Sequence, residues 1–166
     1  MEHFVKIAEM KVMEEQGILK TVVGSCIALC IWDKVKKIGG MVHIMMPRSK
    51  NGAPVSKGKY ADTAVHALYE ELITKDCRKH HLVASLIGGA SVFGNKLAVN
   101  GKKTIGVENY ETAIEHIRQY RIPVQKVEVG GTLGRRVVFD CKRGHITVTM
   151  LDRKSPLTMK RSAKEN

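Results

Sequence analysis

The sequence predicts an α+β fold with its elements arranged in layers. Many short segments alternate polar and apolar residues, and two longer segments repeat apolar residues at helical spacing. The two kinds of segment do not alternate strictly along the chain, which favours mostly antiparallel strands with two main helices over a parallel α/β fold. The chain has 166 residues, of which 43% are hydrophobic. We expect one domain at 1–151 and a basic, flexible tail at 152–166.

The first half of the chain is predicted to form strands and one long loop. Residues 3–13 alternate and indicate an edge strand, and residues 17–23 follow a glycine turn as a second strand. Residues 25–32 and 37–46 are two apolar strands joined at "DKVK". Residues 47–59 are rich in Pro, Gly and Ser and indicate a loop.

The second half is predicted to hold both helices and the remaining strands. Residues 60–77 and 107–121 are the helices, and residues 81–90 form a buried strand that ends in glycines. Three late strands are expected at 124–134, 135–140 and 145–151. The apolar faces of the two helices are formed by Ala61, Val65, Leu68, Leu72 and Ile73, and by Val107, Ala113, Ile114 and Ile117.

The composition narrows the class of partner and the compartment. A net charge of +12 favours an acidic partner, but aromatic residues are only 5% and there is no nucleic-acid-binding motif, so we expect no nucleic acid. No apolar run approaches the roughly 18 residues of a membrane span, so no membrane insertion is expected. The first ten residues, "MEHFVKIAEM", do not resemble a secretory signal, and we expect a cytoplasmic protein.

Four cysteines, Cys26, Cys30, Cys77 and Cys141, form no C-x-x-C pair. In a cytosolic chain such residues are expected to be reduced thiols rather than a disulfide framework. The histidines of "CRKHH" at 77–81 have no second ligand cluster, so we expect no metal site.

The hairpin around "DKVK" raises the question of a reactive pair. A turn centred on Lys34 and Val35 pairs Trp32 with Lys37, and counting back in the same register sets Cys26 opposite His43. Side chains directly opposed in an antiparallel pair have Cβ atoms about 4.5–5.5 Å apart and lie on one face. A slip of one residue would move the two side chains to opposite faces.

A histidine beside a cysteine activates the sulfur as a nucleophile and later protonates the leaving group. A third group usually orients the imidazole, and the candidates are the Thr21 hydroxyl or a backbone carbonyl. Gly24 and Ser25 are candidates to supply backbone N–H groups to an oxyanion. From the hairpin alone, the alternative is that Cys26 and His43 are two buried structural residues.

Several separated motifs resemble the CheD family of chemoreceptor glutamine deamidases. They are "GSCIALCIWD", "KIGGMVHIMMP", "GKYADTAV", "GGASVF", "IGVEN" and "GGTLGRRVVFD", in that order along nearly the whole chain. The resemblance implies an α/β/β sandwich. It also implies hydrolysis of receptor glutamine side-chain amides to glutamate with release of ammonia, and no cofactor.

The resemblance assigns roles to three residues. Cys26, after Gly-Ser, is implied as the nucleophile, and His43, in the "GGMVH" run, as the base. An upstream threonine is the family's third catalytic residue, which gives Thr21 here, although some members place it where this chain has Lys20. Neither glycine-rich loop, "GGASVFG" or "GGTLGRR", fits a phosphate-binding pattern, and turns are the favoured interpretation. The resemblance implies that both loops line the substrate groove, which makes Gly88 and Gly89 candidates for substrate or oxyanion contacts.

The resemblance also implies partners. Chemoreceptor cytoplasmic domains resemble long acidic helical hairpins, to which a basic enzyme is steered by charge. CheD members also bind the phosphatase CheC. The rival hypotheses are therefore an adaptor that binds and stimulates CheC, with catalysis secondary, and a basic nucleic-acid-binding module. Arg135 and Arg136 are candidate contacts for acidic substrate, and a solvated surface charge is the favoured role for at least one of them.

Overall fold

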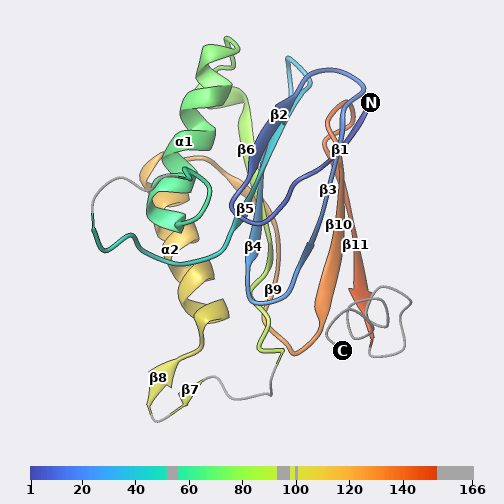
Figure 1. Cartoon of the computed structure of the whole chain (residues 1–166). Coiled ribbons are helices and arrows are strands. Elements are labelled where there is room, and N and C mark those ends of the chain that lie inside the picture. Colours follow the sequence, from blue (N-terminus) through green and yellow to red (C-terminus); the bar gives the residue numbers. More distant parts are fainter. Residues whose placement is uncertain (52–55, 93–97, 100, 153–166) are drawn as a thin grey trace.

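A computed structural model of the chain describes residues 1–51, 56–92, 98–99 and 101–152. Two helices, a five-stranded sheet and a four-stranded sheet lie in three layers (Figure 1), which confirms the predicted α+β fold with its α/β/β arrangement. Two neighbouring strand pairs of the described residues are parallel and the other pairs are antiparallel. Apart from Asp152, the tail predicted at 152–166 lies outside the described residues.

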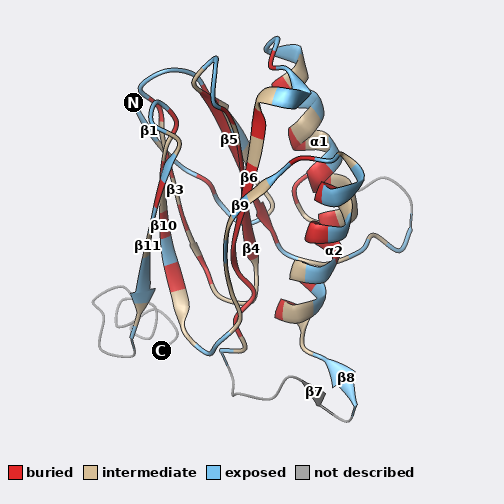
Figure 2. Cartoon of the chain, turned by 180° about the vertical axis from the view of Figure 1, so that it is seen from behind, coloured by how far each residue is buried: buried red, intermediate tan, exposed pale blue. Residues whose placement is uncertain are grey.

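The five-stranded sheet forms the middle layer. Its strand order is β2-β5-β4-β6-β9, and β6 and β9 pair in parallel. The helices α1 and α2 cover one face of it, and the four-stranded sheet covers the other (Figure 2). Its strands are β2 (Met10–Met13), β5 (Ile38–Ile44), β4 (Ile27–Asp33), β6 (Leu82–Gly88) and β9 (Val124–Val129).

The four-stranded sheet has the order β1-β3-β10-β11, and β1 and β3 pair in parallel. The described residues also contain a short hairpin and one turn of 3₁₀ helix, η1 (Lys79–His81). The strands are β1 (Glu2–Phe4), β3 (Ile18–Val23), β10 (Gly134–Asp140) and β11 (His145–Leu151) in the sheet, and β7 (Ala98–Val99) and β8 (Lys102–Lys103) in the hairpin.

The prediction of one edge strand over residues 3–13 was wrong. The segment forms β1 in one sheet and β2 in the other, joined by a crossover at Val5–Glu9. Ala8 adopts a left-handed backbone with φ 65°, which turns the chain between the sheets. Alternation of polar and apolar residues continues on both sides of this turn, so the pattern does not reveal that the chain changes sheets.

The helices α1 (Ala61–Thr74) and α2 (Ile105–Gln119) confirm the predicted apolar faces. Of the predicted residues only Ile73 and Val107 are half-buried, and the others are buried against the sheet (Figure 2). Thr104 caps the start of α2 by accepting a hydrogen bond from the Val107 N–H. Neither helix, nor any other in the described part of the chain, has the length and apolar character needed to cross a bilayer.

Alternate residues of the central strands supply two separate cores. The helix side takes Ile27, Leu29 and Ile31 of β4 together with Val42 and Ile44 of β5. The side facing the second sheet takes Ala28, Cys30 and Met41, and Phe139 of β10 packs against them. On this second side a Cβ at Gly39 would lie 2.7 Å from the Phe139 ring, so the aromatic side chain fills the space beside the glycine.

Candidate active site

The register of the β4–β5 hairpin differs from the predicted one by two residues. Asp33 pairs with Ile38 and Ala28 pairs with His43, so Cys26 is not directly opposite His43. The Asp33 carboxylate accepts the N–H groups of Val35 and Lys36 at 2.9 Å each. These bonds fix a turn over residues 34–37, centred one residue later than predicted, and Lys37 at its end has φ 58°.

Because the register difference is an even number of residues, it keeps Cys26 on the predicted face. Cys26 lies in the β3–β4 connection, one residue before β4, and packs partly against the core between the two sheets. His43 lies in that same layer, because it bonds Thr21 of the second sheet. A diagonal pair of this kind has Cα atoms about 7–8 Å apart and Cβ atoms somewhat closer.

Thr21 and His43 form a buried hydrogen-bonded pair between the sheets. Thr21 Oγ1 lies 2.8 Å from His43 Nδ1 and 2.7 Å from the Val5 carbonyl oxygen, and the two side chains are 0% and 3% exposed. The carbonyl has no proton, so the hydroxyl donates to it and accepts from His43. Nδ1 therefore carries the proton of the neutral ring, and Nε2 is the basic nitrogen.

The Thr21–His43 hydrogen bond favours Thr21 over Lys20, the alternative position for the third catalytic residue. Lys20 lies on the other face of β3, where its ammonium forms an exposed ion pair with Glu2 at 2.6 Å. The Val5 carbonyl bonds the Thr21 hydroxyl, so it reaches His43 only through Thr21.

The crossover at Val5–Glu9 holds the backbone on both sides of this pair. The Val5 N–H donates to the Lys20 carbonyl at 2.8 Å on the β3 side. On the β5 side, the Ala8 N–H donates to the His43 carbonyl at 2.9 Å, and the His43 N–H donates to the Glu9 carbonyl at 3.0 Å. The change of sheet therefore keeps Thr21 and His43 at a fixed separation.

Three successive carbonyls of the β3–β4 connection are each anchored by a donor. The Ala90 N–H donates to Gly24 at 2.9 Å, Asn109 Nδ2 donates to Ser25 at 3.0 Å, and the Gly89 N–H donates to Cys26 at 2.9 Å. Anchored carbonyls leave their peptide planes little freedom to rotate. The segment before β4 is therefore held from β6 and from α2 at once.

Gly88 and Gly89 lie directly behind this connection. Gly88 has φ 122°, and a Cβ there would lie 2.2 Å from the Cys26 carbonyl oxygen, so no other residue fits. The Gly89 N–H is already donated to that same oxygen. Both glycines thus contact the cysteine segment itself, and the predicted contact of either glycine with substrate stays a prediction.

Burial raises the pKa of the half-buried Cys26 thiol above its ordinary value. At neutral pH the thiol is then protonated in the resting protein. The arrangement is suited to removal of the proton during the reaction, by the basic nitrogen of a neutral imidazole, rather than to a permanent thiolate.

Two residues at this site were missed or misread from the sequence. Asn109 is fully buried, and nothing in the sequence beyond its place in "IGVEN" indicated a role for it. Arg135 was expected to contact acidic substrate, but it is 6% exposed and donates to the carbonyls of Gly88 at 3.2 Å and Gly130 at 2.9 Å. Arg136 is exposed.

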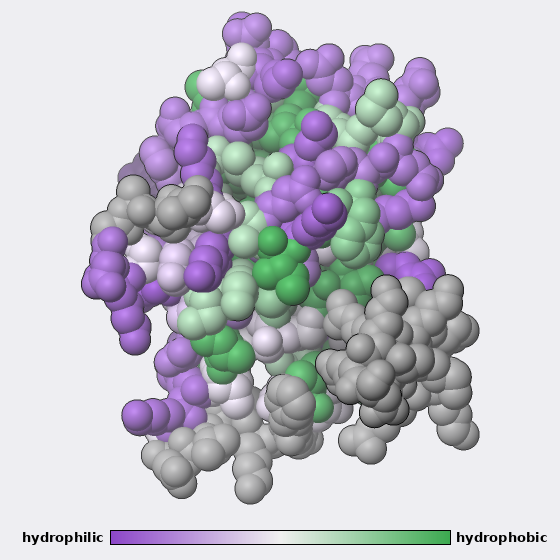
Figure 3. All heavy atoms as spheres, in the orientation of Figure 1, coloured by the Kyte–Doolittle hydropathy of each residue, from purple (hydrophilic) through white to green (hydrophobic). Residues whose placement is uncertain are grey.

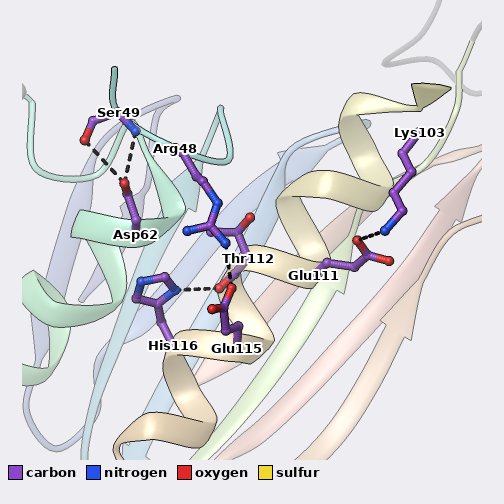
Figure 4. A network of polar contacts seen from close by, with 8 residues as sticks. All are labelled: Arg48, Ser49, Asp62, Lys103, Glu111, Thr112, Glu115 and His116. Carbon is purple, nitrogen blue, oxygen red and sulfur yellow. Dashed lines mark hydrogen bonds and ion pairs between the residues drawn. The ribbon is translucent and has the colours of Figure 1, made fainter. Parts of the chain in front are cut away.

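A groove of about 400 Å³ lies between the β5–α1 connection and α2. Figure 4 shows Arg48 reaching Glu115 and Lys103 reaching Glu111, each ion pair at 2.6 Å. Cys26 and His43 are not among the described residues that line it. Within the described residues, no three His, Cys, Asp or Glu side chains are grouped to hold a metal ion.

Comparison with known proteins decides the family. The model of the family described as "CheD chemotactic sensory transduction" matches residues 45–150. The chain belongs to the CheD family. A relative from Thermotoga maritima, named chemoreceptor glutamine deamidase CheD, is 36% identical over 149 residues, which cover 89% of this chain and 91% of the relative.

Two further CheD relatives are similar at the same level. One from Methanococcus vannielii is 36% identical, covering 87% of this chain and 92% of its own. One from Geobacillus kaustophilus is 36% identical, covering 86% and 88%. Both are named probable chemoreceptor glutamine deamidase CheD. A solved Neisseria meningitidis protein of the family DUF152 aligns over 74% of this chain and 53% of its own, with 8% identity and a TM-score of 0.47, which is too distant for any inference.

Proposed function

We propose that this protein hydrolyses glutamine side-chain amides of chemoreceptors to glutamate, with Cys26 as nucleophile and His43 as base. The observation that carries the proposal is the buried hydrogen bond from His43 Nδ1 to Thr21, which leaves Nε2 as the basic nitrogen in the layer that Cys26 enters. The names of the CheD relatives supply the substrate class.

The proposed reaction needs no cofactor. His43 Nε2 takes the proton from Cys26 as Sγ bonds to the glutamine Cδ, and the carbonyl electrons move onto oxygen. Collapse of the tetrahedral intermediate breaks the C–N bond, and His43 returns the proton to the departing ammonia. Water then attacks the thioester, with its proton passing to His43 and on to the sulfur. The net change is glutamine plus water to glutamate plus ammonia.

Backbone groups of the cysteine segment are proposed to hold the oxyanion. The carbonyls of Gly24 and Ser25 are anchored by Ala90 and Asn109, so the N–H groups of the same two peptides are fixed in the opposite direction. These are the N–H groups of Ser25 and Cys26. Fixed donors stabilise developing charge without reorganising during the reaction.

Exposed apolar side chains border the cysteine segment. Val92 is 41% exposed, and its Cγ1 lies 3.2 Å from where a Gly24 Cβ would be. Met45 is 39% exposed, and its carbonyl, like that of Ser25, accepts a hydrogen bond from Asn109 Nδ2. Figure 3 shows apolar side chains gathered in the middle of one face of the molecule, with polar ones around them. Such a border suits a substrate glutamine presented on the surface of a receptor helix.

The net charge of +12 supports steering toward acidic receptor domains in the cytoplasm. An adaptor that binds CheC would use the same fold without needing the cysteine. The two roles are separated by removing only the sulfur, because Cys26 is half-buried and Ala fits its place.

The test is mass spectrometry of a receptor cytoplasmic fragment incubated with the protein. We expect a gain of about 1 Da at specific glutamines and an equal amount of ammonia, and a loss of about 10³-fold or more in Cys26→Ala. Cys30→Ala is the matched control, because Cys30 is a buried thiol in β4, four residues after Cys26. Deamidation that continues unchanged in Cys26→Ala would sink the proposed nucleophile, and retained CheC stimulation in that variant would identify an adaptor role.

A further inference from the structure

Asn109 is a polar side chain in an otherwise largely apolar helix face, and it is fully buried. Its Nδ2 donates to the Ser25 carbonyl at 3.0 Å and to the Met45 carbonyl at 3.1 Å. Ser25 comes immediately before Cys26, and Met45 comes two residues after His43. One side chain of α2 therefore joins the segment that carries the proposed nucleophile to the end of the strand that carries the proposed base.

Close approach of α2 to the central sheet makes this contact possible. Gly106, one turn before Asn109, packs so tightly that a Cβ there would lie 2.4 Å from the Gly89 carbonyl oxygen. Any larger residue at 106 would push the start of α2 away from β6. The glycine thus brings the helix near enough for a short carboxamide to reach the β3–β4 connection.

The orientation of the Asn109 carboxamide is fixed by its surroundings. Both protons of Nδ2 face carbonyl oxygens, and a flipped side chain would set Oδ1 against the same two acceptors. In the described part of the structure Oδ1 has no hydrogen-bond partner, although it is buried. A buried acceptor without a hydrogen-bond partner is unfavourable. The two hydrogen bonds that Nδ2 donates are therefore the favourable contribution of this side chain.

We propose that Asn109 is a positioning residue for the deamidation, and that it aims the Cys26 N–H at the oxyanion. In a trans peptide the C=O and the following N–H point in opposite directions. Holding the Ser25 carbonyl toward α2 therefore directs the Cys26 N–H away from α2, to the side where a bound amide would develop negative charge. This inference rests on the proposed function and adds a residue to it.

The experiment compares Asn109→Asp and Asn109→Ala with the wild-type chain on a receptor fragment. Asp keeps the size but sets oxygens against the two carbonyls, which releases the Ser25 peptide. We expect kcat to fall about 10²-fold, as when one oxyanion donor is lost, with KM changed less than about threefold. In Asn109→Ala, which adds no charge near the thiol, the rate of Cys26 alkylation by iodoacetamide is expected to stay within about threefold, because alkylation involves no carbonyl oxyanion.

Ile117→Val is the matched control, because it weakens packing on the same face of α2 without contact to the cysteine segment. It is expected to keep kcat. Unchanged kcat in folded Asn109→Asp overturns the inference while leaving the proposed function intact. Equal losses of kcat and alkylation also overturn it, because they indicate collapse of the whole segment.

A second measurement does not depend on the reaction. In ¹H–¹⁵N spectra of the full chain, Asn109→Asp is expected to shift the backbone amide signals of Ser25 and Cys26, while Ile117→Val leaves them in place. Unshifted amide signals in Asn109→Asp overturn the positioning role even if the protein deamidates nothing. If the wild-type chain is inactive and the signals shift, the proposed function fails and the positioning of the peptide stands.

Discussion

On the face of the five-stranded sheet that packs against the helices, β4 and β5 contribute mainly aliphatic side chains, among them Leu29 and Val42, and the buried carboxylate of Asp33 lies at the turn end of β4. On the opposite face the same two strands contribute Cys30, Met41 and His43, and Thr21 of β3 packs against them. The first face gains its free energy mainly from apolar burial. The second buries polar groups that each require a partner, and it is where the candidate chemistry lies. The helix-side face is thus expected to govern stability, and the inter-sheet face to govern activity.

Leu29→Ala is expected to give the largest loss of stability. Leu29 is fully buried on the helix side of β4, and its truncation removes apolar contacts and leaves a cavity. We expect the free energy of unfolding to fall by about 2–5 kcal/mol in urea titrations. The folded fraction should retain its deamidation rate, whereas Cys26→Ala on the same hairpin should lose the rate and keep its stability within about 1 kcal/mol. A large loss of rate per folded molecule in Leu29→Ala would contradict the expectation that the helix-side face governs stability and not activity.

Thr21→Val is expected to have an intermediate effect, mainly on activity. Valine keeps the shape of threonine but removes the acceptor for His43 Nδ1 and the donor to the Val5 carbonyl. By analogy with other groups that orient a functional histidine, we expect kcat/KM for the receptor fragment to fall about 10–100-fold. Thr21→Ser keeps the hydroxyl and is expected to recover most of the rate. Full activity in Thr21→Val would show that His43 needs no orienting group.

The smallest expected effect is on the pH dependence of stability. Burial, followed by the nearby Asp140, raises the pKa of Cys141 to about 12, and burial also raises the pKa of Cys30. Unfolded thiols ionise near pH 8.5, so the unfolded chain loses these protons first and stability falls as pH rises above that value. We expect about 1.4 kcal/mol to be lost per thiol at pH 9.5 relative to pH 7.5.

Urea titrations at the two pH values, under reducing conditions, measure this difference. In Cys141→Ala the loss between pH 7.5 and pH 9.5 is expected to be smaller by the contribution of one thiol, whatever the variant's own stability. An equal pH dependence in the variant and the wild-type chain would rule out Cys141 as one of its sources.

The turn between β4 and β5 shows why the sequence did not predict the register of this strand pair. The two apolar runs on either side of "DKVK" were enough to predict the hairpin and which residues share a face. The pairing itself depends on the Asp33 side chain, which accepts two turn N–H groups, and on the left-handed backbone of Lys37. Several turns fit the same alternation, so the apolar pattern does not select among them.

By itself the sequence determined the layered α+β class and both helices with their buried faces, and these follow from local periodicity. It also predicted Thr21, His43 and Cys26 as one candidate site, from the hairpin and from motifs that resemble the CheD family. Only the tertiary structure decided that β1 and β2 belong to different sheets, that Arg135 points inward, and that Asn109 holds the segment before Cys26. Each of these depends on backbone groups far away in the chain, and no local pattern encodes which distant carbonyl a buried side chain will meet.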